Sequence, residues 1–359
     1  MDFFSIVLIP LLISFIITAL ATPLCIIFLK KFDIVDDPKK HIHPAILHNK
    51  PIPRGGGIPL FLGVFISSIF FLPLTPITQA LFFASFLSLV IGVLDDKYDL
   101  SPYFRFGMNI VAASIVVWSG ITIPFVTNPL GGILEPKQLM NFFPFLATFE
   151  TILPSILAII WIIWVMNMLN WSKGVDGQMP GIVAISAIVI GIVSLRFPLS
   201  DQNTYIAALL SFIIAGAALG FLLFNFSPAK IFPGYGATSI YLLLAAVSIL
   251  SGAKLATALL VMGVPMIDGI FTIGRRIWNG HSPFWHDKKH LHHLLLQFGF
   301  GPKTIALFYW VLSAILGLLA LNLSSKGKLF ALIMILLIIG GTLFSLHSVL
   351  KAKNEKEII

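Results

Sequence analysis

Long runs of apolar residues alternate with short polar stretches along the whole chain. Eleven such runs cover residues 4–29, 57–74, 78–94, 106–126, 152–169, 179–197, 204–225, 237–251, 254–271, 304–322 and 328–350. About 20 apolar residues cross a bilayer as an α-helix, whereas barrel strands show short alternating segments. The pattern therefore predicts an all-α integral membrane protein with about 11 transmembrane helices. Residues 1–350 are expected to form one polytopic domain, followed by a short tail at 351–359.

Basic residues are concentrated in every second loop. With the N-terminus placed outside, 18 of the 23 Lys and Arg residues fall on the inner side. Cytoplasmic loops carry such an excess, so the distribution predicts an outside N-terminus, a cytoplasmic C-terminus and a place in the cytoplasmic (inner) membrane. The net charge of +8 is then partly a result of topology. Its distribution indicates the lipid bilayer and not nucleic acid as a partner. The single cysteine, Cys25, excludes an internal disulfide.

Acidic residues and histidines gather on the same inner side, which the positive-inside rule does not explain. They are Asp33, Asp36, Asp37, Asp95, Asp96, Asp99, Asp176, Asp268, Asp287, His41, His43, His48, His281, His286, His290, His292 and His293. This one-sided distribution indicates a site at the inner membrane surface.

Two adjacent carboxylates, Asp95 and Asp96, end an apolar run. Neighbouring carboxylates repel each other, and burying them near lipid is costly. Mg²⁺ offsets both penalties, because it prefers carboxylate ligands together with substrate phosphate. The pair is therefore a candidate Mg²⁺ site, although a solvated turn explains it equally well.

A polar series at three-residue spacing follows the run at 152–169. Its members are Asn167, Asn170, Lys173 and Asp176. Each step of three drifts by about 60° on an α-helix, so the four cannot share one face. Two glycines within the series indicate that the helix ends there and that the polar groups converge through a loop. Interhelical hydrogen bonding by the asparagines is the structural alternative.

Lys50 and Arg54 precede a run of three glycines, Gly55–Gly57, at the start of an apolar segment. Backbone amides at a helix N-terminus suit phosphate. A phosphate-binding loop is one reading, and a glycine-rich hinge is the other.

The last long inner loop carries Arg275 and Arg276, and then His290, His292 and His293. Together these groups suit a cationic, hydrogen-bonding clamp for a diphosphate. Zinc is the first alternative for clustered histidines, but no cysteine or second histidine pair completes a zinc site. A structural interface loop is the remaining alternative.

Taken together, the motifs resemble those of the polyprenyl-phosphate N-acetylhexosamine-1-phosphate transferases, a glycosyltransferase family 4 type. The resemblance looks closer to the N-acetylglucosamine-1-phosphate branch than to the phospho-MurNAc-pentapeptide translocase branch. The matching residues are Pro51, Pro53, Arg54, Gly56, Gly57, Asp95, Asp96, Asn167, Asn170, Gly174, Asp176, Gly177, Pro228–Phe232, Pro265, Asp268, Ser282–Phe284 and His290–His293.

The resemblance implies transfer of a sugar-1-phosphate from a UDP-sugar to undecaprenyl phosphate. UMP would leave, and the product would start a lipid-linked envelope glycan such as lipopolysaccharide O-antigen or teichoic acid. The family pattern implies catalytic roles for Asp95, Asp96 and Asp176, with Mg²⁺ on the first two. The residues expected to bind substrate are Lys50, Arg54, Asn167, Asn170, Lys173, Arg275, Arg276, His290, His292 and His293.

Two positions depart from the family pattern. Lys173 stands where an aspartate is usual, and Tyr235 stands where a magnesium-ligating aspartate is expected. A neutral phenol, with an ordinary pKa near 10, is a poor Mg²⁺ ligand. Both changes make the site more positive, so we expect weakened Mg²⁺ dependence, with Lys173 contacting the pyrophosphate as a point charge.

Two other functions stay open at this stage. A non-catalytic relative could still bind polyprenyl phosphate or nucleotide-sugar, which the two replacements favour. A transporter is the third reading, although transporters place polar groups near the bilayer midplane rather than at helix ends. The sequence also allows a homodimer, and it does not identify the sugar.

Overall fold

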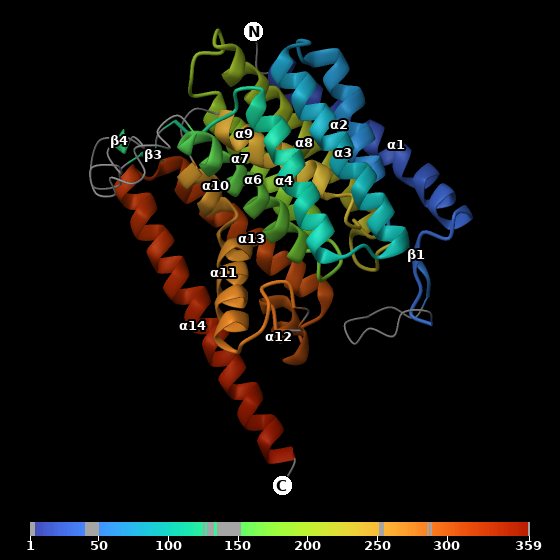
Figure 1. The fold of residues 1–359 in the computed structure, drawn as a ribbon, viewed down its shortest axis with the longest axis vertical. Coiled ribbons are helices and arrows are strands. Elements are labelled where there is room, and N and C mark those ends of the chain that lie inside the picture. The colour runs from blue at the N-terminus through green and yellow to red at the C-terminus, as the bar shows by residue number, and fades with distance from the viewer. Residues whose placement is uncertain are drawn as a thin grey trace.

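The computed structural model describes residues 4–39, 50–124, 126–127, 133–134, 152–250, 255–285, 287 and 289–357. Helices make up most of this described part (Figure 1). They are η1 (Phe4–Leu8), α1 (Ile9–Lys31), α2 (Gly57–Phe71), α3 (Pro76–Tyr98), α4 (Pro102–Trp118), α6 (Leu153–Trp171), α7 (Gln178–Ser194), α8 (Gln202–Asn225), α9 (Thr238–Leu250), α10 (Leu255–Val261), α11 (Gly263–Trp278), α12 (Leu291–Gln297), α13 (Pro302–Asn322) and α14 (Ser325–Glu357).

Within the described residues, four two-residue strands form two small antiparallel pairs. They are β1 (Val35–Asp36) with β2 (Ile52–Pro53), and β3 (Val126–Thr127) with β4 (Ile133–Leu134). The prediction of an all-α protein is therefore confirmed for the architecture of the described chain.

Local signals set the beginnings of several helices. Pro76, Pro102 and Pro302 occupy the first position of α3, α4 and α13, where a missing N–H breaks no helical hydrogen bond. Thr75 caps α3: its hydroxyl accepts the Thr78 N–H (3.1 Å), and the Thr78 hydroxyl accepts the Thr75 N–H (2.8 Å). These caps place the helix starts close to those predicted from the apolar runs.

Each of the eleven predicted segments overlaps a helix, although several of their ends differ by a few residues or more. The run at 106–126 corresponds to α4, which already ends at Trp118, before Gly120 with φ +101°. The run at 254–271 contains two helices, α10 and α11, which meet at an 83° bend. Apolar character alone does not distinguish a straight helix from a bent pair.

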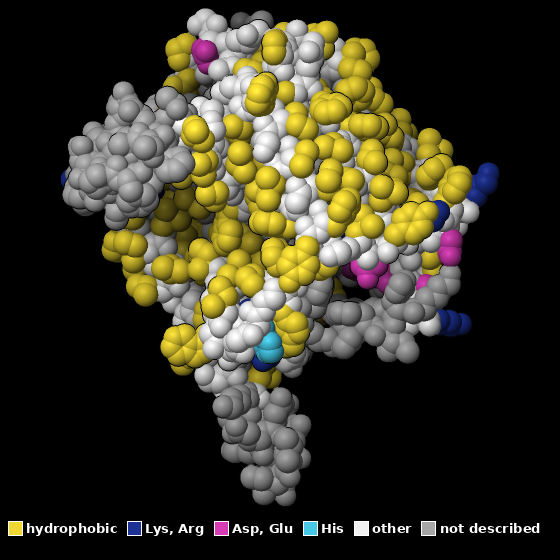
Figure 2. Space-filling view, viewed as in Figure 1, with side chains coloured by type: hydrophobic (Ala, Val, Ile, Leu, Met, Phe, Trp, Pro, Cys, Tyr) yellow, Lys and Arg dark blue, Asp and Glu magenta, His cyan; other side chains and the backbone are white. Residues whose placement is uncertain are grey.

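The described helices have the length and the surface of a membrane protein. Six are long and apolar enough to cross a bilayer, or seven if the bent pair counts as one span, while α2, α7 and α9 are shorter apolar helices. On the face in Figure 2, hydrophobic side chains cover the body, and most of the charged side chains in view lie along the right-hand side. The chain is a multi-pass membrane protein, and the count of eleven spans stays a prediction.

Helices α7, α8 and α9 form the buried centre of the bundle. The most apolar stretch of α8 is 83% buried, against 17% for α14 at the periphery. Glycines let α1 approach α8 closely: a Cβ on Gly216 would lie 2.1 Å from the Leu11 carbonyl oxygen. Such small-residue contacts are typical of helix packing in membranes.

The elements that carry the polar motifs lie in the lower half of the bundle, where β1 and α12 are found (Figure 1). Gly57 of α2 and Gly92 of α3 both pack against the backbone of Gly236, just before α9. A Cβ would lie 2.1 Å from Gly236 C if added to Gly57, and 2.3 Å from Gly236 Cα if added to Gly92. This close crossing brings together the start of α2, the last turns of α3 and the start of α9.

Candidate active site

A cavity of about 250 Å³ opens where these helix ends meet. It is lined by Arg54, Pro102, Arg105, Phe106, Asn167, Asn170, Trp171, Lys173, Tyr235, Arg276, Phe284, Trp285, Asp287 and His290. The lining comes from the segment before α2, from α4, α6 and α11, and from the loops before α7, α9 and α12. Polar segments far apart in the sequence therefore converge on one cavity.

Asp96 ties Arg54 to the loop before α9. The Arg54 Nε lies 3.0 Å from Asp96 Oδ1. The same carboxylate accepts the N–H groups of Tyr235 (2.8 Å) and Gly236 (3.4 Å). Gly234 has φ +67°, and a Cβ there would lie 2.1 Å from Asp96 Oδ2, so only glycine fits this turn. Asp96 thereby positions two parts of the cavity wall.

Asp95 holds Arg105 in a similar way. Arg105 Nη1 lies 3.0 and 3.1 Å from the two Asp95 oxygens, and the Leu100 N–H donates to Oδ1 (3.0 Å). Asp95 is fully buried, while Arg105 lines the cavity. The Arg105 guanidinium also lies 5.0 Å above the Tyr235 ring, which is cation–π distance.

Lys173 enters the same cluster from the loop after α6. Its Nζ donates to the Gly234 carbonyl oxygen (2.9 Å) and lies 5.7 Å from the centre of the Tyr235 ring. Burial and the nearby Arg54 guanidinium lower the pKa of Lys173 to about 7, although Asp96 opposes the shift. Near neutral pH Lys173 is therefore partly a neutral amine, and a bound phosphate would favour its ammonium form.

The Tyr235 hydroxyl points to α4. It accepts a hydrogen bond from Asn109 Nδ2 (3.1 Å). Burial raises the pKa of this phenol above its ordinary value of 10, so Tyr235 is neutral at physiological pH.

Asp176 binds the loop after α8 and does not line the cavity. Its Oδ2 accepts the Ala229 N–H (3.0 Å). Beside it, the Gly177 N–H donates to Asn225 Oδ1 (3.1 Å). These contacts join the start of α7 to the segment that follows α8, and any contact of Asp176 with substrate stays a prediction.

Both asparagines of α6 line the cavity. Asn167 Nδ2 donates to the Ile163 carbonyl oxygen of its own helix (2.8 Å). Asn170 Oδ1 is buried without a hydrogen-bond partner among the described residues. Because a buried acceptor without a partner is costly, Asn170 is a candidate contact for a bound polar ligand.

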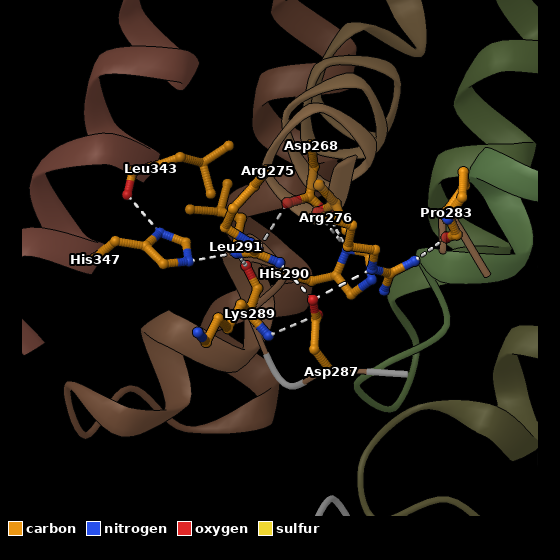
Figure 3. Close-up of polar contacts among 11 residues, drawn as sticks. Asp268, Arg275, Arg276, Pro283, Asp287, Lys289, His290, Leu291, Leu343 and His347 are labelled. Atoms are coloured by element: carbon orange, nitrogen blue, oxygen red, sulfur yellow. Dashed lines mark hydrogen bonds and ion pairs between the residues drawn. The ribbon is translucent and has the colours of Figure 1, made fainter. Parts of the chain in front are cut away.

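Asp268 of α11 orients His290 (Figure 3). His290 Nδ1 lies 2.8 Å from Asp268 Oδ2, and the Leu291 N–H donates to Asp268 Oδ1 (2.9 Å). A carboxylate only accepts hydrogen bonds, so Nδ1 carries a proton and Nε2 is left for a ligand. Thr272 Oγ1 lies 3.3 Å from the same Nδ1.

His292 and His293 pack close to His290, with ring centres 5.6 and 6.2 Å from its own. His292 is 1% exposed, and burial lowers its pKa well below the ordinary 6.5. Its ring packs against Gly174, where a Cβ would lie 1.9 Å from Nε2. His293 is half-buried, with its ring centre 4.2 Å from that of His292. Neither residue is among those that line the cavity.

Asp287 binds both arginines of α11 (Figure 3). Its Oδ2 lies 2.6 Å from Arg275 Nη2 and 3.2 Å from Arg276 Nε. Although burial opposes the shift, the two guanidinium groups lower the pKa of Asp287. Arg276 lines the cavity, donates to the Pro283 carbonyl oxygen (2.6 Å) and lies 5.3 Å from the Trp171 ring. Arg275 instead braces the loop, through the Lys289 carbonyl oxygen and His347 of α14.

The structure thus divides the predicted site residues into two groups. Those that line the cavity are Arg54, Asn167, Asn170, Lys173, Arg276 and His290. Those that do not are Lys50, Asp95, Asp96, Asp176, Arg275, His292 and His293, of which Lys50 is exposed. His41, His43, His48 and His286 lie outside the described residues.

Several residues that build the site carry no predicted role, namely Asp268, Asp287, Arg105, Asn109, Trp171, Phe284 and Trp285. A signal was present for Asp268, because an acid within an apolar run needs a partner. The aromatic residues gave no such signal in a chain with 32 Phe and 7 Trp.

Zinc was the alternative for the histidine cluster. No group of three or more His, Cys, Asp or Glu among the described residues could hold a metal ion.

Comparison with known proteins identifies relatives across most of the chain. A protein-family model described as glycosyl transferase family 4 matches residues 78–252. The chain is 32% identical to the decaprenyl-phosphate N-acetylglucosaminephosphotransferase of Mycobacterium leprae, over 82% of this chain and 79% of the relative. The chain belongs to glycosyl transferase family 4. It is thus a transferase by family, and the resemblance read from its motifs is confirmed.

Two further family 4 relatives share a name. They are the undecaprenyl-phosphate alpha-N-acetylglucosaminyl 1-phosphate transferases of Pasteurella multocida and Thermotoga maritima. The first is 29% identical over 85% of this chain and 84% of its own. The second is 26% identical over 79% of this chain and 78% of its own.

Proposed function

We propose that the chain transfers a sugar-1-phosphate, N-acetylhexosamine-1-phosphate, from a UDP-sugar to a polyprenyl phosphate and releases UMP. The observation that carries the proposal is one cavity at the helix ends where cations from separate segments meet: Arg54, Arg105, Lys173 and Arg276. Such a cluster suits a diphosphate. The names of these relatives, which specify polyprenyl-phosphate acceptors and N-acetylglucosamine, agree with it.

The reaction exchanges one phosphoryl bond for another. An oxygen of the lipid phosphate forms a bond to the β-phosphorus of the UDP-sugar. The bond from that phosphorus to the oxygen of the α-phosphate breaks, and its electron pair leaves with UMP. Because the attacking phosphate is already an anion, no base is required, and positioning with charge neutralisation does the catalysis.

The chain's own residues suit these tasks. Lys173, Arg276 and His290 face the cavity and can bind the phosphates, with His290 held by Asp268. Asn170 offers its unpartnered Oδ1 to the sugar or the base. In this account Asp95 and Asp96 are positioning residues, because each holds an arginine at the wall.

We place the cavity at the cytoplasmic face of the cytoplasmic membrane, with the N-terminus outside. The excess of Lys and Arg in the loops on the cavity's side supports this orientation. The product would then be a lipid-linked sugar for an envelope glycan. Undecaprenyl phosphate is the acceptor named for the Pasteurella and Thermotoga relatives.

The test is an assay of the purified full chain in lipid nanodiscs with UDP-N-acetylglucosamine and undecaprenyl phosphate. We expect UMP and lipid-linked sugar phosphate to appear in equal amounts. Release of UDP, or no product from any UDP-N-acetylhexosamine, would contradict the proposal.

A matched pair of variants connects the activity to the cavity. Arg276→Met removes a cavity cation, and we expect turnover to fall about 100-fold, as when one preorganised donor is lost. Arg196→Met is the same change just after the C-terminal end of α7, whereas the cavity lies near the start of that helix. Arg196 donates to the Leu321 carbonyl oxygen. That control should leave turnover unchanged.

A further inference from the structure

Both carboxylates at the end of α3 already bind the protein's own groups. Asp95 binds Arg105 with both oxygens and accepts the Leu100 N–H. Asp96 binds Arg54 and accepts two backbone N–H groups of the loop before α9. The side chains of both aspartates have no exposed surface.

The neighbouring oxygen donors do not suit Mg²⁺ either. This ion requires near-octahedral oxygen ligands and usually keeps several waters beside one or two carboxylates. The Tyr235 hydroxyl is a neutral phenol bonded to Asn109, and the Gly234 carbonyl oxygen accepts from Lys173. The groups around Asp95 and Asp96 therefore do not fit a bound magnesium ion.

Lys173 brings a cation to the loop that Asp96 holds. Its ammonium lies against the Gly234 carbonyl and the Tyr235 ring, next to Asp96. It also lines the cavity, together with Arg54 and Arg105. A compact ammonium with three donors can contact phosphate oxygens directly.

We propose that Lys173, backed by Arg54 and Arg105, takes the place of a divalent cation, so that phosphoryl transfer proceeds without bound metal. This inference rests on the proposed function. In the transfer step, Lys173 neutralises the charge that develops on the α-phosphate oxygen as its bond to the β-phosphorus breaks. The electron pair leaves with UMP, and no proton or further reactant is needed.

The first test measures turnover of the full chain with UDP-N-acetylglucosamine and undecaprenyl phosphate, in EDTA and in Mg²⁺. We expect equal rates in the two buffers. Lys173→Met should lower turnover about 100-fold in both, while Lys173→Arg, which keeps the charge, should retain more of it. Lys97→Met, the same change at an exposed lysine that does not line the cavity, is the control.

The second test reverses the two departures from the family pattern. The double variant Lys173→Asp/Tyr235→Asp removes the ammonium and adds two carboxylates beside Asp96. We expect its turnover to vanish in EDTA and to return with Mg²⁺. Wild-type turnover that vanishes in EDTA and returns with Mg²⁺, with Lys173→Met unaffected, would overturn the inference.

A third measurement does not depend on turnover. Electron paramagnetic resonance with Mn²⁺ counts ions bound to the protein without substrate. We expect no stoichiometric binding to the wild-type chain. Binding of one Mn²⁺ per chain that is lost in Asp96→Asn would overturn the inference, whether or not the chain is active. The absence of lipid product in every assay would instead refute the proposed function.

Discussion

A methyl group added at Gly174 would collide with the ring of His292. The new Cβ would lie 1.9 Å from His292 Nε2 and 2.2 Å from Cδ2. His292 is 1% exposed and cannot turn into solvent, so the loop after α6 must move away from α12. Overpacking of this kind costs about 1–3 kcal/mol. Lys173 precedes Gly174 directly, so we expect Gly174→Ala to impair both stability and turnover.

The assay is thermal unfolding of the purified protein together with turnover. Gly107→Ala in α4 is the matched control, because nothing lies within 4 Å of a Cβ there. Alanine is favoured over glycine in a helix by roughly 0.5–1 kcal/mol. The control should therefore be neutral or slightly stabilising and fully active.

A double-mutant cycle separates the collision from other effects of the substitution. His292→Ala removes the ring, so Gly174→Ala should cost far less stability in that background than in the wild type. If Gly174→Ala proved as stable and active as the wild type, or if its cost were unchanged in the His292→Ala background, the packing of this loop against α12 would be refuted.

Three further predictions follow from the same geometry. Gly92→Ala should destabilise by about 3 kcal/mol or more, because its Cβ would lie 2.3 Å from backbone Cα of Gly236; a folded, fully active variant in thermal unfolding would contradict the crossing. Asp268→Asn should lower kcat/KM by about 10-fold or more, because His290 loses its charged acceptor and such a hydrogen bond is worth roughly 1.5–3 kcal/mol. An unchanged rate and pH profile would contradict this role of Asp268. The pKa of His292 lies below its ordinary 6.5, so the unfolded chain takes up a proton there before the folded chain does. The contribution of His292 to the free energy of unfolding should therefore be highest above pH 6.5 and fall below that value, by up to about 1.4 kcal/mol per pH unit. His292→Gln should flatten this part of a plot of melting temperature against pH.

Helix positions were predictable because apolar runs and proline caps leave few alternatives. The run at 78–94 became α3 and the run at 204–225 became α8. The bend between α10 and α11 was not predictable, because apolar residues continue through the 83° angle. Membrane crossing was likewise easier to infer than the number of spans, since short helices such as α9 satisfy the same hydropathy.

The polar positions of the site were largely visible, but their roles were not. Asp95 and Asp96 stand out in the sequence, yet only the structure shows that each holds an arginine. His290 and His292 are two residues apart, and one lines the cavity while the other is buried. Long-range partners decide these differences: Asp268 lies 22 residues before His290 along the chain. Spacing alone carries no information about such a partner.

The most direct test of the account is a cryo-electron microscopy structure of the full chain in nanodiscs with UDP-N-acetylglucosamine. We predict a diphosphate in the cavity, within hydrogen-bonding distance (about 3.2 Å or less) of Lys173 Nζ and His290 Nε2. A nucleotide-sugar bound outside this cavity, or a diphosphate without a contact to either residue, would contradict it.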